Sequence, residues 1–312
     1  MAEPRRLTDL AKRIADQASF PEADAVVALS GGADSATLAA IAADVGTVVR
    51  CVHVHHGLPA SDRLAEAAVA VAEKIGLDVQ VTEVELAEGP SPEAVAREAR
   101  YAAFAQQVSD HDALLLGHTE NDQAETIILN LVRGAGLKGM TGMPYHRPPN
   151  IYRPLLGVTR DETREYAMLR GLPFHDDPTN FDRTLRRNEI RLDILPRLED
   201  LNPQVIASLA AMGETIRSDA EYLEELAGAH PTLRLGDGAV GIPVGVLTTL
   251  HSAVRARVLA TLVGDLRSSQ GLSREELARI EEVAFGLSAR TELEGRLTVR
   301  VDRALLVVSK GS

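Results

Sequence analysis

The chain has 312 residues, 45% of them hydrophobic, so it is long enough for two globular domains that each bury a core. Its one cysteine, Cys51, excludes an intrachain disulfide and a Cys-x-x-Cys metal or redox site, which favours a reducing cytoplasm as its compartment. Its formal net charge of -12 argues, taken alone, against a nucleic-acid partner, because affinity for phosphates depends largely on Lys and Arg.

The N-terminal segment, residues 1–17, interrupts its apolar residues with charges every few positions. This pattern predicts an amphipathic helix, and we expect no signal peptide. No apolar run approaches the ~20 residues that a membrane helix needs, so we expect no membrane partner.

The next part of the chain alternates short apolar runs with longer stretches of helical periodicity. The apolar runs predict strands at residues 25–29, 48–54, 79–84 and 113–117. Alternation of this kind is typical of an α/β fold, in which helices cover both faces of a doubly wound parallel sheet.

The pattern changes after Leu201. Helical periodicity recurs at about residues 203–227, 246–265 and 273–286, and an alternating segment at the end suggests a closing β-hairpin. We therefore expect two domains. The first, residues 1–200, holds the parallel sheet, and the second, residues 201–312, is smaller and mostly helical.

The sequence SGGADS, residues 30–35, directly follows the first predicted strand. Parallel sheets bind ligands at the carboxyl ends of their strands. Glycines there let backbone amides approach a ligand, and the next helix presents unpaired N–H groups and the positive end of its dipole. The pattern predicts a phosphate site, although a tight turn with Asp34 or Ser35 as helix cap is the alternative. Without Gly-Lys-Ser/Thr or a third glycine it is neither a Walker loop nor a dinucleotide fingerprint.

The SGGADS segment resembles the pyrophosphate loop, SGGxDS, of the N-type ATP pyrophosphatases of the PP-loop superfamily. These enzymes split ATP between its α- and β-phosphates to adenylate a substrate. The superfamily includes GMP synthetase, NAD synthetase, several tRNA thiolases and the tRNA(Ile)-lysidine synthetases. The loop implies the chemistry and leaves the substrate open.

Three further segments resemble the tRNA(Ile)-lysidine synthetases, and the first is CVHVHHGLPAS, residues 51–61. His55 and Pro59 replace the usual residues of the family's HxxHGLR segment. Strand alternation would place His53 and His55 on the face opposite His56, and no carboxylate or Cys lies at ligand spacing, so we expect no zinc site. The segment matches the family at His53, His56, Gly57 and Leu58.

The second segment, residues 117–143, resembles the family's HxxDDQAETxxxxLxRGxGxxGLxGM, with Asn121 in place of the first Asp. On a helix, Asp122 and Glu125 share one face, which His118 can approach. Such a trio could hold Mg²⁺ or bind the ammonium of a lysine. The alternative is a solvated acidic helix start, where carboxylates favour the dipole.

The glycine-rich end of this segment, residues 134–142, is poorly suited to a regular element and carries Lys138, with Arg133 just before it. We expect a mobile loop over the site.

The third segment, residues 174–198, resembles the family's DxSNxDxxxxRNxIRxxxxP. Five arginines between residues 183 and 197 form a local basic patch that the net charge conceals. These arginines either pair with carboxylates or contact phosphates, and the resemblance favours phosphates. Upstream, Arg97, Arg100 and Tyr101 resemble the family's AR-x-x-RY helix, which is expected near the nucleotide phosphates. The third segment matches the family at Asp177, Asn180, Asp182, Arg187, Asn188, Ile190, Arg191 and Pro196.

The resemblance implies a cytoplasmic ligase of the short form that uses ATP, Mg²⁺ and L-lysine to make lysidine at the wobble cytidine in the CAU anticodon of tRNA(Ile). The smaller domain would bind substrate. The ATP-binding residues that it implies are Ser30, Gly31, Gly32, Ala33, Asp34, Ser35, His53, Arg97 and Arg100. The catalytic candidates are Asp34, Asp122, Glu125 and His118, with Asp34 and Asp122 as magnesium ligands. The candidates for tRNA binding are Arg133, Lys138, Arg187, Asn188 and Arg191.

Two other functions stay open. A tRNA thiolase shares the loop, but such enzymes commonly use paired cysteines, and Cys51 stands alone. A nucleotide sensor would bind ATP without catalysis, and the intact carboxylates Asp34, Asp122 and Glu125 argue against it. The sequence does not decide the oligomeric state, a homodimer included.

Overall fold

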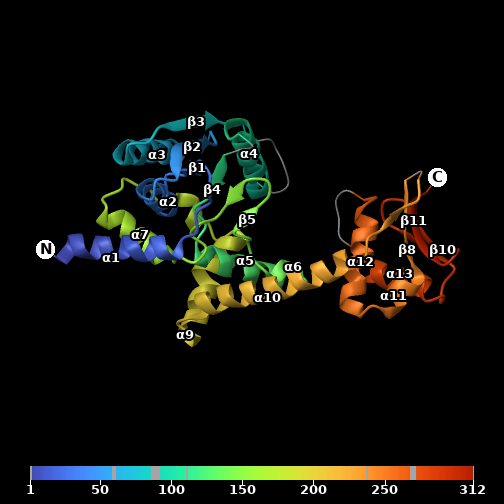
Figure 1. Ribbon diagram of the computed structural model, residues 1–312. Helices are drawn as coiled ribbons and strands as arrows, with labels where there is room; N and C mark the ends of the chain where they lie inside the picture. Colours follow the sequence, from blue (N-terminus) through green and yellow to red (C-terminus); the bar gives the residue numbers. More distant parts are fainter. Residues whose placement is uncertain are drawn as a thin grey trace. The chain divides into compact units, whose positions relative to one another are not determined.

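The chain forms two compact units, Met1–Thr215 and Ile216–Ser312 (Figure 1). The boundary between the units lies inside the long helix α10 (Val205–Gly228), so the division into residues 1–200 and 201–312 stays a prediction. The computed structural model describes residues 2–57, 61–85, 92–109, 112–236, 238–267 and 272–311.

A six-stranded sheet organises the first unit, with the strand order β3-β2-β1-β4-β6-β5. β1 lies at the centre and is parallel to both β2 and β4, while only β5 at the edge is antiparallel. Successive strands run outward from β1 in one direction and then restart at β4 on its other side. The β1–β4 border is therefore the switch point at which such sheets bind ligands. The strands are β1 (Ala25–Ala28), β2 (Val48–His55), β3 (Val79–Glu83), β4 (Ala113–Leu115), β5 (His146–Arg147) and β6 (Ile151–Tyr152).

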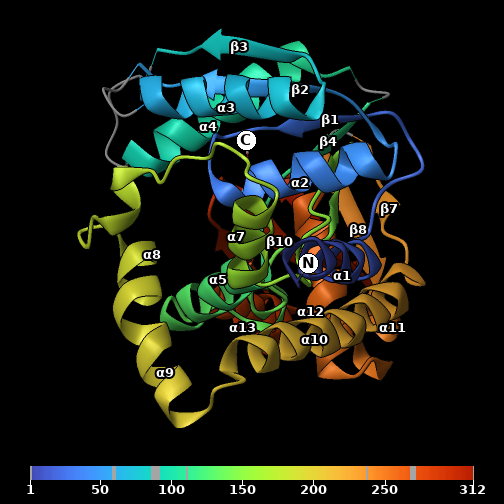
Figure 2. The ribbon, with the colours of Figure 1, turned by 90° about the vertical axis from the view of Figure 1, so that its left-hand side faces the viewer.

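Helices cover both faces of this sheet, because successive side chains of a strand point to opposite faces. Ala25 and Val27 of β1 belong to the larger core, with side chains of α1, α2, α3 and α7. Val26 packs on the other face with Phe104 of α4. Figure 2 looks at the molecule from the side of α1. The predicted doubly wound α/β fold is confirmed. These helices are α1 (Ala2–Gln17), α2 (Ala33–Asp44), α3 (Ser61–Ile75), α4 (Pro92–Gln107) and α7 (Arg160–Leu169).

Six further helices in the described part of the first unit follow β4 and β6, and α5, η2 and α9 among them share a small core that contains Ala124, Ile128, Ile190 and Leu195. They are α5 (Glu120–Val132), α6 (Leu137–Met140), η1 (Pro178–Phe181), α8 (Arg186–Glu189), η2 (Ile190–Ile194) and α9 (Leu195–Leu201).

The arginine-rich segment contains one π-helical turn, η2, between α8 and α9. Pro196 has no N–H to donate to the turn before it, and the amide of Leu195 bonds instead to the carbonyl of Ile190, five residues back. The turn carries Arg191.

The second unit combines helices with a five-stranded antiparallel sheet of order β7-β8-β11-β10-β9. The sequence predicted only its closing hairpin, β10–β11, because β7, β8 and β9 are too short to show alternation. His251 interrupts the predicted helix 246–265, since its Nδ1 accepts the amide of Ala253 (3.2 Å) and starts a new helix. The elements are β7 (Leu233–Arg234), β8 (Ala239–Pro243), α11 (Val244–Thr249), α12 (Ser252–Gly264), α13 (Arg274–Ala284), β9 (Arg290–Leu293), β10 (Leu297–Asp302) and β11 (Leu305–Lys310).

None of the helices within the described ranges is both long and apolar enough to cross a membrane.

Candidate active site

The glycine-rich loop, residues 30–35, joins β1 to α2, and two glycines are needed for its close packing. Gly31 has φ +88, and a Cβ there would lie 2.2 Å from the carbonyl oxygen of Leu64. Gly117, just after β4, passes close to the backbone of Ser35. A Cβ added at Gly117 would lie 3.1 Å from the backbone nitrogen of Ser35. Gly32 caps α2 without a side-chain hydrogen bond, which leaves the first amides of α2 available to an anion.

Two serines hold the shape of this loop. The hydroxyl of Ser35 donates to the carbonyl of Gly32 and accepts from the amide of Ser30, both at 3.0 Å. The two hydroxyls lie 2.9 Å apart. The amide of Gly32 also donates to the Ser30 hydroxyl (3.4 Å), so both serine side chains are committed within the loop.

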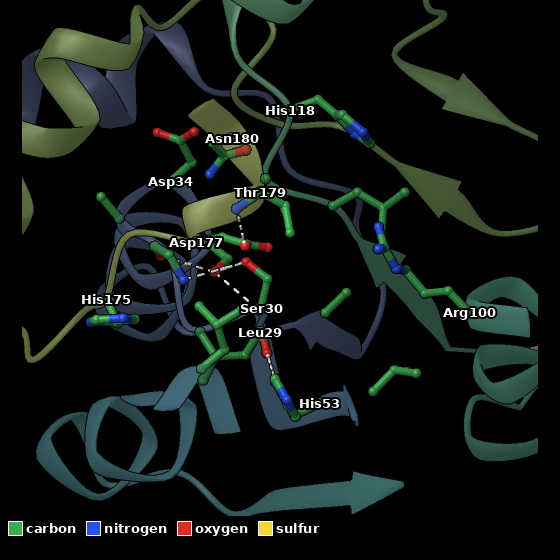
Figure 3. Close-up of a pocket in the computed structure, with 18 of the residues that line it drawn as sticks. Leu29, Ser30, Asp34, His53, Arg100, His118, His175, Asp177, Thr179 and Asn180 are labelled. Carbon is green, nitrogen blue, oxygen red and sulfur yellow. Dashed lines mark hydrogen bonds between the residues drawn. The ribbon is translucent and has the colours of Figure 1, made fainter. Parts of the chain in front are cut away.

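The loop opens into a cavity of about 480 Å³, which is within the usual range for a small-molecule site. Figure 3 shows Arg100 and His118 on the side of this cavity away from His175. The structure brings together nearly all of the residues predicted to bind ATP, and only Gly31, which packs against Leu64, is outside the lining. The predicted residues that line it are Ser30, Gly32, Ala33, Asp34, Ser35, His53, Arg97 and Arg100.

Three histidines lie at the end of β2, and His53 and His56 line the cavity. His53 Nδ1 donates to the carbonyl of Leu29 (2.8 Å), and its buried Nε2 has no partner among the described residues (Figure 3). His56 Nε2 accepts from Arg100 (3.4 Å), and burial lowers the pKa of His56 to about 4. His55 pairs with Asp62 (2.9 Å).

His53 and His56 both line the cavity, as do Val52 and Val54, so their predicted placement on opposite faces of the strand stays a prediction. β2 ends at His55, so strand alternation no longer governs the next residue. Leu58 and Pro59, of the same segment, lie outside the described residues.

Asp122 and Glu125, the acidic pair, form ion pairs with three arginines that we call the arginine cluster. These are Arg160, Arg187 and Arg191. Asp122 Oδ1 accepts from Arg160 (3.1 Å) and Arg187 (3.0 Å) and lies 3.5 Å from Arg191 Nη2. Glu125 accepts from Arg160 (3.1 Å), Arg187 (2.8 Å) and Arg191 (2.7 and 3.1 Å). The Glu125 side chain has 0% exposure, so these guanidiniums replace the water that a carboxylate needs.

Asp122 has a second set of partners. It is the N3 residue of a capping box at the start of α5, and its Oδ2 accepts from the amide (2.8 Å) and hydroxyl (2.9 Å) of Thr119. Burial raises the pKa of Asp122, but Arg160 and Arg187 outweigh burial and hold it well below the usual range. Asp122 is therefore a fixed anion rather than a proton acceptor.

Asp34 lies between the loop and the arginine cluster. The Thr163 hydroxyl hydrogen-bonds to it, and Arg160 Nε lies 3.8 Å from its Oδ2. Burial raises the pKa of Asp34 to about 6, although Thr163 opposes the shift. Its carboxylate lines the cavity and has one distant charged partner, so it suits a hard cation.

Magnesium fits this site only in part. The described residues hold no cluster of three or more His, Cys, Asp or Glu side chains placed for a metal, but Mg²⁺ commonly takes one or two carboxylates and the phosphates of a substrate. Asp34 meets that requirement. Both oxygens of Asp122 are already used by Thr119 and the arginines, which makes Asp122 the poorer ligand.

His118 lines the cavity, whereas Glu125 lies behind it. Burial lowers the pKa of His118 to about 3, so the imidazole is neutral, and its buried Nδ1 has no partner within the described part of the chain. His118 is thus a side chain of the cavity lining with one buried ring nitrogen unsatisfied among the described residues.

The residues predicted to bind tRNA fall into two groups. Arg187 and Arg191 pair with the acidic pair, which is the alternative that the sequence left open. Asn188 donates to the carbonyls of Thr179 (2.8 Å) and Asp182 (2.9 Å). Arg133 and Lys138, by contrast, are exposed at the end of α5 and on α6.

The glycine-rich segment, residues 134–142, contains helix α6 and is tied to α5. Asn130 Nδ2 donates to the carbonyl of Gly139 (2.6 Å). Just beyond the segment, the amide of Met143 donates to Gln123 (2.6 Å). The predicted mobility of this segment stays a prediction.

The sequence analysis missed Arg160, which contacts all three acidic residues of the site. It is the first residue of α7 and lies between Thr159 and Glu162, which form the capping box of this helix. That T-x-x-E signature marks a helix start and could have placed Arg160 at the edge of the sheet. Thr163 was also missed, as was His175, whose amide donates to the carbonyl of Gly31 (2.9 Å).

Residues 5–198 match the family model described as PP-loop domain. The tRNA(Ile)-lysidine synthase of Salinispora arenicola is 40% identical over 284 residues, which cover 86% of this chain and 85% of that protein. The tRNA(Ile)-lysidine synthase of Streptomyces coelicolor is 35% identical over 300 residues, 92% of this chain and 85% of that protein.

Other relatives are longer. The tRNA(Ile)-lysidine synthase of Pseudomonas fluorescens is 40% identical over 210 residues, and the chain spans only 48% of its length. Among solved structures, the U34-tRNA thiolase NcsA of Methanococcus maripaludis has a TM-score of 0.56 at 18% identity, over 67% of this chain and 78% of that chain, which shows a shared fold. The sequence matches show that the chain belongs to the PP-loop family and, within it, to the tRNA(Ile)-lysidine synthases.

Proposed function

We propose that this chain ligates L-lysine to C2 of the wobble cytidine in the CAU anticodon of tRNA(Ile), with ATP converted to AMP and diphosphate. The observation that carries the proposal is that a pyrophosphate-type loop and Asp122 of the acidic pair line one cavity, at the switch point of the sheet. Relatives named tRNA(Ile)-lysidine synthase support the choice of substrate.

The first step must activate the cytosine, because the oxygen on C2 is a poor leaving group. Transfer of AMP onto that oxygen makes it a good one and releases diphosphate. We assign the diphosphate to the amides of Ala33 and Asp34 at the start of α2, where the helix dipole favours an anion. Asp34 would hold Mg²⁺, which supplies charge neutralisation on the phosphates when bound.

The second step is attack of the lysine ε-amine on C2, with loss of AMP. The amine is protonated at neutral pH, with a reference pKa of about 10.4, so it must be bound as an ammonium and then deprotonated. We assign ammonium binding to the acidic pair, because the low pKa of Asp122 makes it an anchor and a poor base. His118 is our candidate for the proton acceptor because it lines the cavity beside Asp122; with a pKa lowered by burial to about 3, it is a weak base in the ligand-free chain.

The tRNA would approach through the exposed cations. Arg133 and Lys138 are solvent-exposed and suited to phosphate contacts, whereas Arg187 and Arg191 could reach a phosphate only by leaving the acidic pair. A cytoplasmic location and a homodimer stay predictions.

The test is release of diphosphate from ATP by the purified chain, with tRNA(Ile) carrying CAU, and incorporation of labelled lysine into that tRNA. The proposal expects adenylated tRNA when lysine is omitted and lysidine when it is present. Methionine tRNA, which has the same anticodon, is the control. Sulfur transfer without a need for lysine would support the thiolase instead.

A further inference from the structure

The charges around the acidic pair are balanced without any ligand. The three guanidiniums of the arginine cluster face three carboxylates, those of the acidic pair and Asp34. A lysine ammonium that joined this set would be a fourth cation in a largely buried site, and burial of an unbalanced charge is unfavourable. The acidic pair can therefore accept lysine only if a guanidinium leaves it.

Two members of the arginine cluster are placed to leave. Arg160 and Arg191 both line the cavity into which the glycine-rich loop opens, and Arg160 already lies 3.8 Å from Asp34 of that loop. Their side chains are 24% and 22% exposed, whereas Glu125 is fully buried. A triphosphate in the cavity would bring several negative charges within their reach, and guanidinium forks match phosphate oxygens well.

We propose that the arginine cluster makes nucleotide binding a precondition for lysine binding. The phosphates of ATP draw Arg160 and Arg191 from the acidic pair, and the oxygens that they leave take the ε-ammonium. The ammonium and Arg187, which keeps its contacts with both carboxylates, then balance the charge of the acidic pair, so Glu125 stays paired throughout. The inference rests on the proposed function, and it adds an order of binding in which the nucleotide precedes lysine.

The alternative is a permanent structural cluster. If the arginines never leave, lysine binds elsewhere and its affinity is independent of ATP. Coupling between two sites is reciprocal. If the arginines leave, each ligand raises the affinity of the chain for the other by the same factor, and if they stay, neither affinity changes.

The first experiment is calorimetric titration of lysine into the whole chain, with and without an ATP analogue whose α–β bridge cannot be cleaved. We expect the analogue to tighten lysine binding at least about tenfold, within the usual range of allosteric coupling, and lysine to tighten the analogue by the same factor. Equal lysine affinity in both titrations would overturn the inference.

The second experiment uses Arg160→Gln, with Arg170→Gln as its matched control. Arg170, next to the end of α7, pairs with Asp44 and is outside the cavity lining. Arg160→Gln should raise the affinity for lysine in the absence of nucleotide and reduce the coupling. Arg170→Gln should leave both as in the original chain. Unchanged coupling in Arg160→Gln would contradict the role of this arginine.

These results separate the inference from the proposed function. If tRNA is adenylated but lysine affinity ignores the nucleotide, only the inference fails. If tRNA is not adenylated at all, the proposed function fails, whatever the coupling. Melting curves of both variants report on folding, and the titrations of the unaltered chain test the inference even if a variant does not fold.

Discussion

The glycine-rich loop and the acidic pair bind charge by opposite means. The loop uses backbone amides held by glycines and internal serine bonds, so it is complete before a ligand arrives. The acidic pair uses side chains that are satisfied by other side chains, so a ligand there must displace a partner. Both regions are thus formed in the ligand-free chain, but the charge of the acidic pair is already neutralised by arginines, so a cation cannot bind there unless an arginine leaves.

Glu125→Gln should have the largest effect on stability and on lysine transfer, because it removes a buried carboxylate that pairs with the whole arginine cluster. We expect the free energy of unfolding to fall by about 3–5 kcal/mol. Adenylated tRNA should accumulate while lysine transfer fails. Chemical denaturation and a separated assay of the two steps measure these effects.

The control is Glu165→Gln, which removes an exposed pair with Arg6 and should cost less than about 1 kcal/mol. Equal costs for Glu125→Gln and Glu165→Gln would mean that the buried cluster contributes no more than a surface pair. Loss of adenylation in Glu125→Gln would instead move Glu125 from lysine binding to the metal.

Gly31→Ala should rank next and act on the loop. It combines a left-handed φ, which costs a non-glycine residue about 1–3 kcal/mol, with a Cβ 2.2 Å from the carbonyl oxygen of Leu64. Gly46→Ala is the matched control, with φ +77 and open space around its Cβ. We expect the first variant to lose diphosphate release and to melt lower than the second. Similar melting temperatures would show that the loop tolerates the displacement.

A smaller effect is expected from Thr163→Val on pH dependence. Asp34 must be ionised to hold Mg²⁺, and its pKa of about 6 predicts that diphosphate release falls as the pH drops through that value. The Thr163 hydrogen bond lowers the pKa of Asp34, so its loss should move the acid limb of the profile to higher pH. A pH–rate profile that does not move would separate Asp34 from the rate.

The smallest effect is expected from Lys138→Ala. If the exposed ammonium of Lys138 binds a phosphate, its removal should weaken tRNA binding and lower the salt slope by about one phosphate's worth, with no change in melting. Arg191→Ala, by contrast, should lower the melting temperature of the ligand-free chain and leave the salt slope unchanged, because Arg191 pairs with Glu125. A reduced salt slope in Arg191→Ala as well would show that this arginine reaches the tRNA in the complex.

The sheet and the loop could be predicted because their signals are local. Apolar runs and their spacing mark the strands, and the two glycines mark the turn after β1. The arginine cluster could not be predicted, because nothing in a single sequence says that Arg160 and Arg191 meet a glutamate 35 and 66 residues earlier. The second sheet was underestimated for a related reason. β7 has only two residues, so its pairing with β8 depends on tertiary contacts.

The capping box of α5 has a consequence for the order of folding. Thr119 and Asp122 bond within one turn, so this part of the site can form as soon as α5 does. Arg187 and Arg191 must close much longer loops to arrive, and long closures come later. The carboxylates can therefore stay hydrated until α7 and α8 dock, and they lose water only when their counter-charges are already in place. The acidic pair would then lose its water in the same late folding step in which α7 and α8 dock.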